Sequence, residues 1–146
     1  MNRDFAEMLN ALSAAGVEYL IVGAHAVALH GHLRATKDLD IWIRPTRENA
    51  TRVWAALASF GAPLREVTQE DLATPGTIYQ LGIEPNRIDF INDIPGVQFE
   101  SAWANRTMAT IDGVEYPVIG RADLIRNKRA TGRPHDLEDA DALERQ

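Results

Sequence analysis

The sequence predicts a single α+β domain in which helices flank a mixed β-sheet. Apolar residues recur at spacings of three and four between Phe5 and Leu12, which is the period of an amphipathic helix. Residues 38–43 instead alternate between polar and apolar side chains, which is the period of a strand. Asp112-Gly113 separates two β-like runs and is a strong hairpin signal. Helices and antiparallel strands are therefore both expected.

The predicted elements follow one another without an internal repeat or an interdomain linker. Helices are expected over about residues 5–15, 25–30, 46–60, 122–131 and 136–143, with a short turn after Thr68, and strands over 19–22, 38–43, 77–83, 87–91, 108–111 and 114–119. Early helices and strands alternate, and paired strands and two helices then complete the chain, which is typical of an α+β fold. A length of 146 residues suits one domain with one core, so residues 1–146 are expected to form it.

Composition restricts the classes of partner and compartment. The 15 basic and 21 acidic residues give a net charge of −6, so the overall field does not attract nucleic acid, and a polyanion would need a local basic patch or a metal ion. The chain has no cysteine, which excludes disulfides and thiolate metal sites and is typical of a reducing cytoplasm. No apolar run approaches the roughly 20 residues that span a bilayer, so a cytoplasmic location without a membrane partner is expected.

Two acids in the predicted strand over residues 38–43 are candidate metal ligands. Asp38 and Asp40 lie two residues apart, which places both side chains on one face, opposite Leu39 and Ile41, with backbone positions roughly 6.6 Å apart. Neighbouring carboxylates repel, so such a pair commonly holds a cation, and Mg²⁺ suits carboxylate oxygens together with water and phosphates. The alternative is a solvent-facing polar edge, although aspartate is depleted in strands. The spacing alone does not decide between them.

A third acid occurs in the β-like run 87–91. Asp89 is the only acid in this run, and a strand neighbouring residues 38–43 would place it beside Asp38 and Asp40. Three carboxylates on one face would form a site for divalent ions. The alternative is that Asp89 is the cross-strand partner of an arginine.

Gly23-Ala24 and Lys128 are candidate phosphate contacts. Gly23-Ala24 lies between a predicted strand and a predicted helix, where free backbone N–H groups favour an anion such as a triphosphate. A plain strand-to-helix turn is the alternative. Lys128 falls on the apolar stripe of its helix with Leu124 and Ile125, so it either reaches inward to a phosphate or extends its amine to solvent.

The remaining polar residues of interest have simpler interpretations. His25, His30 and His32 match no zinc-binding spacing, and polar or capping roles are expected for them. Asp136 follows Pro134 at a predicted helix start, where an N-cap is expected.

Taken together, these residues resemble a known family pattern. Val22-Gly23-Ala24-His25-Ala26, His30-Gly31, Arg34, Thr36 and Asp38-Leu39-Asp40-Ile41 resemble the first motif of the DNA polymerase β-like nucleotidyltransferase superfamily. The similarity is closest to small bacterial members related to AbiEii toxins. Asp89 matches the third carboxylate, and residues 123–139 look like the C-terminal segment with a lysine and an Arg-x-x-Asp motif. The resemblance covers about residues 19–143.

This resemblance implies a nucleotidyltransferase fold and a metal-dependent reaction. In the family, three acids bind two divalent ions, Mg²⁺ or Mn²⁺; a nucleoside triphosphate is bound, an acceptor hydroxyl is activated, and pyrophosphate leaves. By position, the implied catalytic and metal-binding residues are Asp38, Asp40 and Asp89, and the implied nucleotide-binding residues are Gly23, Ala24, Arg34, Thr36 and Lys128. Asp89 would also orient or deprotonate the acceptor, which is an RNA, a protein or a small molecule.

Two departures from the family pattern leave a second function open. The usual Gly-Ser or Gly-Gly pair is Gly23-Ala24 here, without a hydroxyl contact, and the sequence has no counterpart of the larger C-terminal domain that selects substrate in many relatives. The alternative is a non-catalytic nucleotide-binding or interaction protein, such as a toxin–antitoxin component with a partner protein or a second copy of the chain. The presence of all three acids favours the enzyme.

Overall fold

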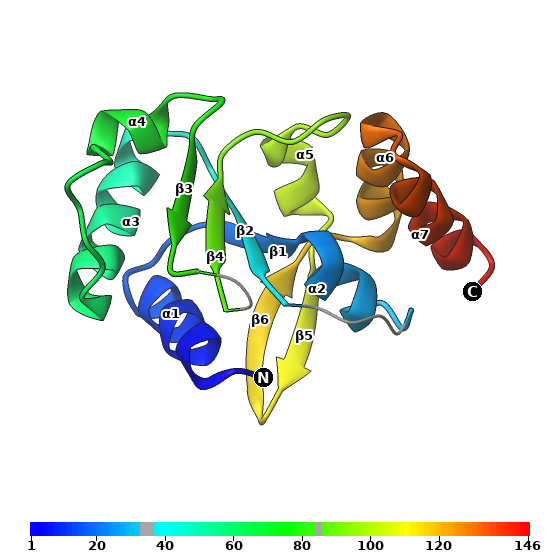
Figure 1. The fold of residues 1–146 in the computed structure, drawn as a ribbon, viewed down its shortest axis with the longest axis horizontal. Helices are drawn as coiled ribbons and strands as arrows, with labels where there is room; N and C mark the ends of the chain where they lie inside the picture. Colours follow the sequence, from blue (N-terminus) through cyan, green and yellow to red (C-terminus); the bar gives the residue numbers. More distant parts are fainter. Residues whose placement is uncertain (33–36, 84–85) are drawn as a thin grey trace.

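Six strands form one mixed β-sheet in the computed structural model, which describes residues 1–32, 37–83 and 86–146 (Figure 1). The strands are β1 (Tyr19–Val22), β2 (Leu39–Ile43), β3 (Ile78–Leu81), β4 (Ile88–Ile91), β5 (Thr107–Ile111) and β6 (Val114–Val118). Their order is β3-β4-β2-β1-β6-β5. β1 and β2 run antiparallel, as do β3–β4 and β5–β6, whereas β2–β4 and β1–β6 are parallel. The predicted mixed sheet is therefore confirmed.

Helices cover both faces of the sheet. Those of the described residues are α1 (Arg3–Ala14), α2 (Gly23–Leu29), α3 (Arg47–Phe60), α4 (Gln69–Ala73), α5 (Phe99–Ala104), α6 (Arg121–Thr131) and α7 (Pro134–Glu144). The sequence predicted all of them except α5. That helix has six residues and no side-chain cap at Gln98, so only the spacing of Phe99, Ala102 and Trp103 marks it.

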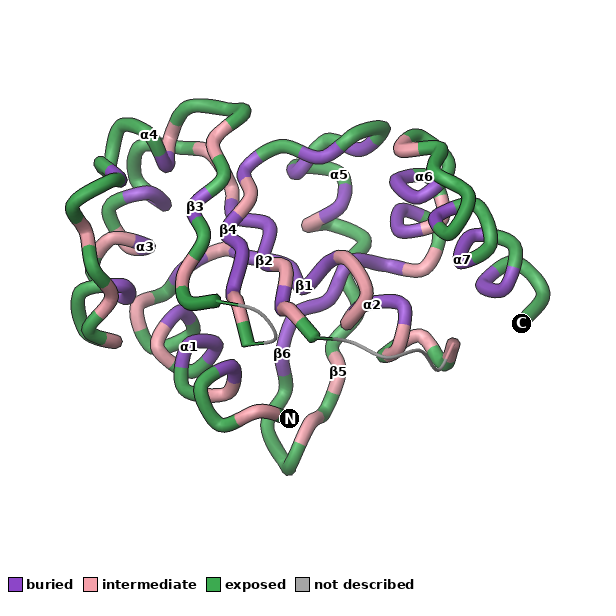
Figure 2. The backbone as a smooth tube through the Cα atoms, in the orientation of Figure 1, coloured by how far each residue is buried: buried purple, intermediate pink, exposed green. Residues whose placement is uncertain are grey.

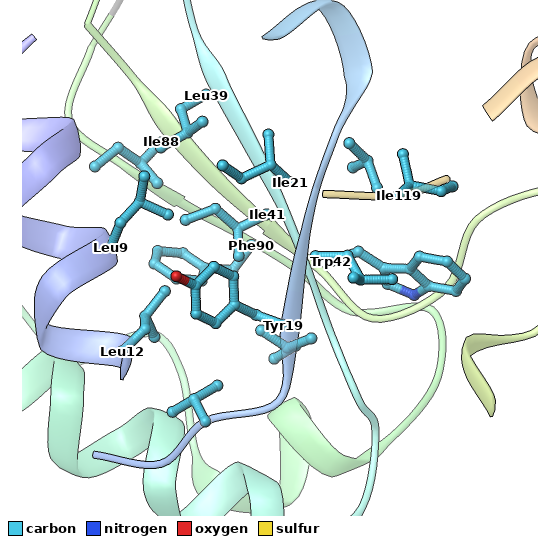
Figure 3. Close-up of a cluster of buried hydrophobic side chains, with 14 of the residues drawn as sticks. Leu9, Leu12, Tyr19, Ile21, Leu39, Ile41, Trp42, Ile88, Phe90 and Ile119 are labelled. Atoms are coloured by element: carbon cyan, nitrogen blue, oxygen red, sulfur yellow. The ribbon is translucent and has the colours of Figure 1, made fainter. Parts of the chain in front are cut away.

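One face of the sheet packs against α1 and α3 (Figure 1). Leu9 and Leu12 of α1 lie beside Tyr19, Ile41 and Phe90 of the central strands (Figure 3). The Tyr19 hydroxyl also lies 3.0 Å from the Ser13 hydroxyl at the end of α1. The apolar side chains that alternate along β1, β2 and β4 therefore form the main core.

The opposite face of the sheet is directed toward α5, α6 and α7 (Figure 1). Trp42 lies on this side of β2 and packs edge-on against Phe99 of α5, with ring centroids 5.0 Å apart. Because side chains two residues apart share a face, Asp40 points the same way. The central strands are largely buried, whereas β3 and β5 at the two edges are more exposed (Figure 2).

Local sequence signals explain several element boundaries. Thr46 caps α3, and Thr68 with Asp71 forms a capping box at α4, as predicted. Asp112 and Gly113 adopt φ values of 52° and 82° in the turn between β5 and β6, which confirms the predicted hairpin. Within the described residues, none of the helices has the length and apolar character required to cross a membrane.

Candidate active site

Asp40 and Asp89 occupy directly opposed positions on neighbouring strands. β2 and β4 run parallel, and their register pairs Asp40 with Asp89. Val22 of β1 and Gln80 of β3 complete the same row across the sheet. The adjacent positions Leu39 and Ile41 are fully buried on the other face, so the two carboxylates share the face that is directed toward α5, α6 and α7.

Asp38 lies in a bend immediately before β2, not on the strand as predicted. Its Oδ1 accepts a hydrogen bond of 3.0 Å from the Arg87 backbone N–H, and its Oδ2 lies 3.6 Å from the Arg87 guanidinium. The same guanidinium donates to both oxygens of Asp89, at 2.7 Å from Nε and 3.1 Å from Nη2. Arg87 thus links Asp38 to Asp89, and the arginine partner considered for Asp89 comes from its own strand segment.

Negative charge is crowded around Asp40. Burial raises the pKa of the Asp40 carboxyl to about 6, and the charges of Asp89 and Asp38 add to this rise. The positive charges of Lys128 and Arg87 oppose it but do not outweigh it. The Asp40 carboxylate is therefore incompletely neutralised by the described residues, which is the electrostatic condition that favours an added cation.

Gly23 follows β1 directly and touches Asp40. Its backbone has φ of 68°, a conformation that glycine adopts without strain. A Cβ atom built at Gly23 would lie 2.2 Å from Asp40 Oδ2. Glycine is required here for two reasons, because the turn needs a positive φ and because the carboxylate occupies the space of a side chain.

A cavity of about 400 Å³ opens beside these residues and runs from the sheet to α6 and α7. Gly23, Ala24 and Asp40 line it on one side and Lys128 on the other. Its volume is in the usual range for a small-molecule site. Four of the residues predicted from the sequence therefore meet in one cavity, whereas Asp38 and Asp89 are not among its lining residues.

Lys128 is buried on the α6 side of the cavity. Its Nζ lies 3.3 Å from Asp136 Oδ1 and 3.5 Å from Asp139 Oδ2, both on α7. The side chain is only 10% exposed, so the amine does not extend to solvent. Lys128 reaches inward, but its immediate partners are carboxylates of this chain.

Asp136 is the most completely bonded acid at this end of the cavity. Burial would raise its pKa, but hydrogen bonds from Arg133 and Thr131 and the charge of Lys128 lower the pKa to about 2. The predicted N-cap role is wrong, because Arg133 is the N-cap of α7 and Asp136 lies inside the first turn. The Asp136–Asp139 spacing of three residues, which places both on one helix face, was the signal for this network in the sequence.

Other predicted residues lie elsewhere or beyond the described part of the chain. Arg34 and Thr36 fall in residues 33–36, outside the described residues. His30 Nε2 lies 2.7 Å from the Ile119 carbonyl, which is a polar role as expected. The buried Nε2 of His25 has no hydrogen-bond partner among the described residues, and its ring packs edge-on against Phe5. Arg87 was missed, although its spacing of two from Asp89 on a strand indicated a shared face.

The carboxylates fit a divalent cation in donor type and in charge. Hard oxygen ligands are what Mg²⁺ and Mn²⁺ prefer, and burial together with the charge of Asp89 raises the pKa of Asp40, so a cation beside it would be favourable. Within the described residues, no group of three or more His, Cys, Asp or Glu side chains is already arranged to hold a metal ion. Arg87 provides a physical reason for this arrangement, because its guanidinium forms an ion pair with Asp89 and lies close to the Asp38 carboxylate.

Solved structures share this fold. A candidate nucleotidyltransferase from Thermotoga maritima (TM1012) matches with a TM-score of 0.62 at 17% identity, over 98% of this chain and 89% of its own. The lincosamide antibiotic adenylyltransferase LnuA, bound to lincomycin, matches with a TM-score of 0.62 at 15% identity, over 99% and 96% of the two chains. An antigenic nucleotidyltransferase-like protein from Paracoccidioides brasiliensis matches with a TM-score of 0.58 at 20% identity, over 96% of this chain and 74% of its own. At these identities, the likeness concerns the fold.

These similarities assign the chain the nucleotidyltransferase fold, and Asp40 and Asp89 lie opposite each other in it beside the Gly23 turn. The chain belongs to the family described as "Nucleotidyl transferase of unknown function (DUF2204)", whose profile matches residues 1–146. It is therefore a nucleotidyltransferase of the superfamily that the sequence resembled. Among curated proteins, none matches this chain in sequence.

Proposed function

We propose that this nucleotidyltransferase moves a nucleoside monophosphate from a nucleoside triphosphate to a hydroxyl acceptor, with divalent metal bound by Asp38, Asp40 and Asp89. The observation that carries the proposal is the register of Asp40 and Asp89 on one face of the sheet, with Gly23 against Asp40. Mg²⁺ is the expected ion, with Mn²⁺ as a substitute, and two ions suit a displacement at phosphorus. The lack of cysteine fits a reducing compartment such as the cytoplasm.

The proposed roles follow from position around the cavity. Gly23 and Ala24 line the wall beside Asp40, where they would lie against the phosphates of the nucleotide. Lys128 faces them from α6 and would place positive charge near the leaving pyrophosphate. Asp89 would orient the acceptor hydroxyl and accept its proton. Arg34 and Thr36, assigned by resemblance to the triphosphate, complete the proposed set.

Bound metal would neutralise the developing charge on phosphorus-linked oxygens. The chain's own groups prepare for this by holding the carboxylates in place. Arg87 fixes Asp89 with two hydrogen bonds and Asp38 through its backbone N–H and guanidinium. Gly23 leaves room for the Asp40 carboxylate.

A second function is favoured by one observation. Arg87 already holds Asp89 through two hydrogen bonds and lies beside Asp38, and the described residues form no complete metal-ligand group. In a non-catalytic nucleotide-binding or interaction protein, such as one component of a toxin–antitoxin pair, this arginine would permanently replace the metal. The two functions differ in whether nucleotide binding requires divalent metal.

The deciding experiment measures nucleotide binding and transfer with and without metal. The protein is incubated with each α-³²P-labelled nucleoside triphosphate in EDTA, Mg²⁺ or Mn²⁺, beginning with ATP because LnuA is an adenylyltransferase. Metal-dependent binding and transfer of label to an acceptor are expected. Binding that is equal in EDTA would favour the non-catalytic protein, and no binding of any nucleotide would overturn both.

Lys128 provides a test of the nucleotide end of the cavity. Lys128→Ala should weaken nucleotide binding, and Lys128→Arg should restore it poorly, because the compact amine is held between two carboxylates. Arg129→Ala is the matched control, since Arg129 is the next residue on α6 and pairs with the more exposed Asp141 and Glu144. Unchanged affinity in folded Lys128→Ala would remove Lys128 from the nucleotide site.

A further inference from the structure

An apolar surface lies next to the carboxylate row on the same face of the sheet. The row Gln80–Asp89–Asp40 is followed, two residues along each strand, by the row Ile78–Ile91–Trp42. Ile78 is 62% exposed, and it lines the cavity together with Ile91, Ile94 and Pro95. We call Ile78, Ile91, Ile94 and Pro95 the β3–β4 shelf. A second cavity of about 290 Å³ continues along these same four residues.

The geometry of phosphoryl transfer assigns a direction to this shelf. The attacking and leaving oxygens lie roughly in line on opposite sides of the reacting phosphorus. Gly23 follows Val22, which flanks Asp40 on the β1 side, whereas Asp89 flanks Asp40 on the β4 side. If pyrophosphate leaves toward Gly23 and Lys128, the acceptor enters from the β4 side, where the β3–β4 shelf lies one row along the strands from Asp89.

The charge of this surface favours a cationic acceptor. Asp93 is exposed and lines both cavities, and among the described residues it is the one charged residue around the smaller cavity. The basic residues of the larger cavity, Lys128, Arg133 and His135, lie on its α6–α7 side. The chain also carries a net charge of −6. A polyanion such as RNA would be repelled from Asp93, whereas a protonated amine would gain an ion pair. The cavity volumes of about 400 and 290 Å³ suit a small molecule rather than a macromolecular surface.

We infer that the β3–β4 shelf and Asp93 bind the acceptor, and that this acceptor is a small hydroxylated molecule with an apolar body and a protonated amine. The inference rests on the proposed nucleotidyl transfer and names its acceptor class. In the reaction, the acceptor oxygen bonds to the α-phosphorus while the bond from that phosphorus to the bridging oxygen of the β-phosphate breaks. The hydroxyl proton passes to Asp89, and pyrophosphate leaves with the electron pair of the broken bond.

Three matched probes separate the apolar, cationic and anionic contributions. Phenylalaninol carries a hydroxyl, a phenyl ring and an amine; 3-phenylpropan-1-ol lacks the amine; and 2-benzyl-3-hydroxypropanoate replaces it with a carboxylate. Their dissociation constants are measured by ligand-observed NMR with the wild-type protein, Mg²⁺ and a non-hydrolysable ATP analogue. Phenylalaninol should bind about threefold to fivefold more tightly than the neutral alcohol, and the carboxylate most weakly.

Two substitutions and two controls locate the probes. Asp93→Asn should abolish the preference for the amine, and Ile78→Ser should weaken all three probes roughly fivefold. The controls are Asp112→Asn, in the β5–β6 turn, and Met108→Ser, an exposed apolar residue on the opposite edge strand. Both controls should bind the probes as wild type does.

The outcomes distinguish this inference from the proposed function. Metal-dependent nucleotide binding without probe binding, or with probe binding that Ile78→Ser and Asp93→Asn leave unchanged, would overturn the acceptor class and keep the transferase reaction. Transfer of label from ATP to total tRNA, but to none of the probes, would assign the acceptor to RNA instead. If the wild-type protein bound no nucleotide, both the transferase reaction and the acceptor class would be overturned.

Discussion

The sheet side and the α6–α7 side of the cavity carry acids in opposite electrostatic states. On the sheet, Arg87 pairs with Asp38 and Asp89, and the pKa of Asp40 is raised to about 6 by burial and by its acidic neighbours. At the α6–α7 side, hydrogen bonds and the charge of Lys128 overcome the effect of burial, and the pKa of Asp136 falls to about 2. Both acids line one cavity.

This difference separates a surface that can accept a cation from one that is already neutralised. Asp136 receives hydrogen bonds from Lys128, Thr131 and Arg133, so an added cation would gain little there. Asp40 has a destabilised negative charge, so a cation beside it would relieve repulsion. The sheet side is therefore where we propose that the reaction takes place, and the carboxylates of the α6–α7 side hold Lys128 in position.

The largest expected effect is the loss of transfer in Asp40→Asn. The substitution keeps the size of the side chain but removes the charge that metal would bind, so turnover should fall at least about a thousandfold, which is about 4 kcal/mol. Initial rates of label transfer from nucleoside triphosphate measure this. Asp112→Asn, on an exposed turn, should retain the wild-type rate, and a similar rate in Asp40→Asn would remove Asp40 from the reaction.

A smaller effect, a loss of stability, is expected from a substitution on the α6–α7 side of the cavity. Asp136→Asn leaves Lys128 buried with a weakened partner, so the free energy of unfolding should fall by about 3 kcal/mol. Asp141→Asn, which weakens the more exposed pair with Arg129, should cost under about 1 kcal/mol. Urea denaturation at pH 7 measures both, and equal losses in the two variants would show that burial of the Lys128 pair has no energetic consequence.

The lowered pKa of Asp136 adds a pH dependence to this prediction. The contribution of the Asp136 carboxylate to the free energy of unfolding is present above the usual carboxyl pKa near 4 and is lost as the pH falls toward about 2. In this range the unfolded chain binds the proton more tightly than the folded chain does. The stability difference between wild type and Asp136→Asn should therefore shrink between pH 4 and pH 2. A constant difference over this range would contradict the assignment.

Gly23→Ala tests the contact between the β1 turn and the sheet acids. Its Cβ would lie 2.2 Å from Asp40 Oδ2 at a φ of 68°, so a loss of about 2 kcal/mol in stability and a loss of transfer are expected. Gly61→Ala is the matched control, because Gly61 also has a positive φ, of 91°, but no atom within 4 Å of its Cβ position. It should cost about 1 kcal/mol and leave transfer unchanged. Equal transfer in both variants would contradict the role of this contact.

The sequence predicted the fold where periodicity and turn chemistry are local. The strand around Ile41 and the hairpin at Asp112-Gly113 have patterns complete within a few residues, and both are confirmed. Helix α5 was missed because only six residues carry its spacing and no capping side chain precedes it. The order β3-β4-β2-β1-β6-β5 depends on pairing between distant segments, which no local pattern encodes.

The sequence predicted which residues lie at the candidate site better than it predicted the contacts that these residues make. Asp40 beside Asp89 followed once two strands were assumed to be neighbours, and their register bears out that placement. The carboxylates around Lys128 and the arginine between Asp38 and Asp89 were not predicted, because they depend on how α7 packs against α6 and on side-chain rotamers at the start of β4. The metal and nucleotide roles of these residues stay predictions.

The smallest expected effect is the pH dependence of metal-free stability. Because the folded pKa of Asp40, about 6, lies above the usual value of 3.8, the folded chain binds the proton more tightly than the unfolded chain between these two pH values. Stability is therefore lost as the pH rises from about 4 to 7. Asp40→Asn abolishes this loss, so in EDTA its free energy of unfolding should exceed that of wild type by about 1 to 2 kcal/mol at pH 7.5 and by little at pH 4.

Mg²⁺ with nucleoside triphosphate should then stabilise wild type, by about 2.7 kcal/mol at a hundredfold excess over Kd, and leave the stability of Asp40→Asn unchanged. Urea denaturation at the two pH values measures the difference, with Asp112→Asn as the control. If Asp40→Asn and wild type were equally stable at pH 7.5, and neither responded to metal and nucleotide, the sheet side would carry no functional carboxylate cluster.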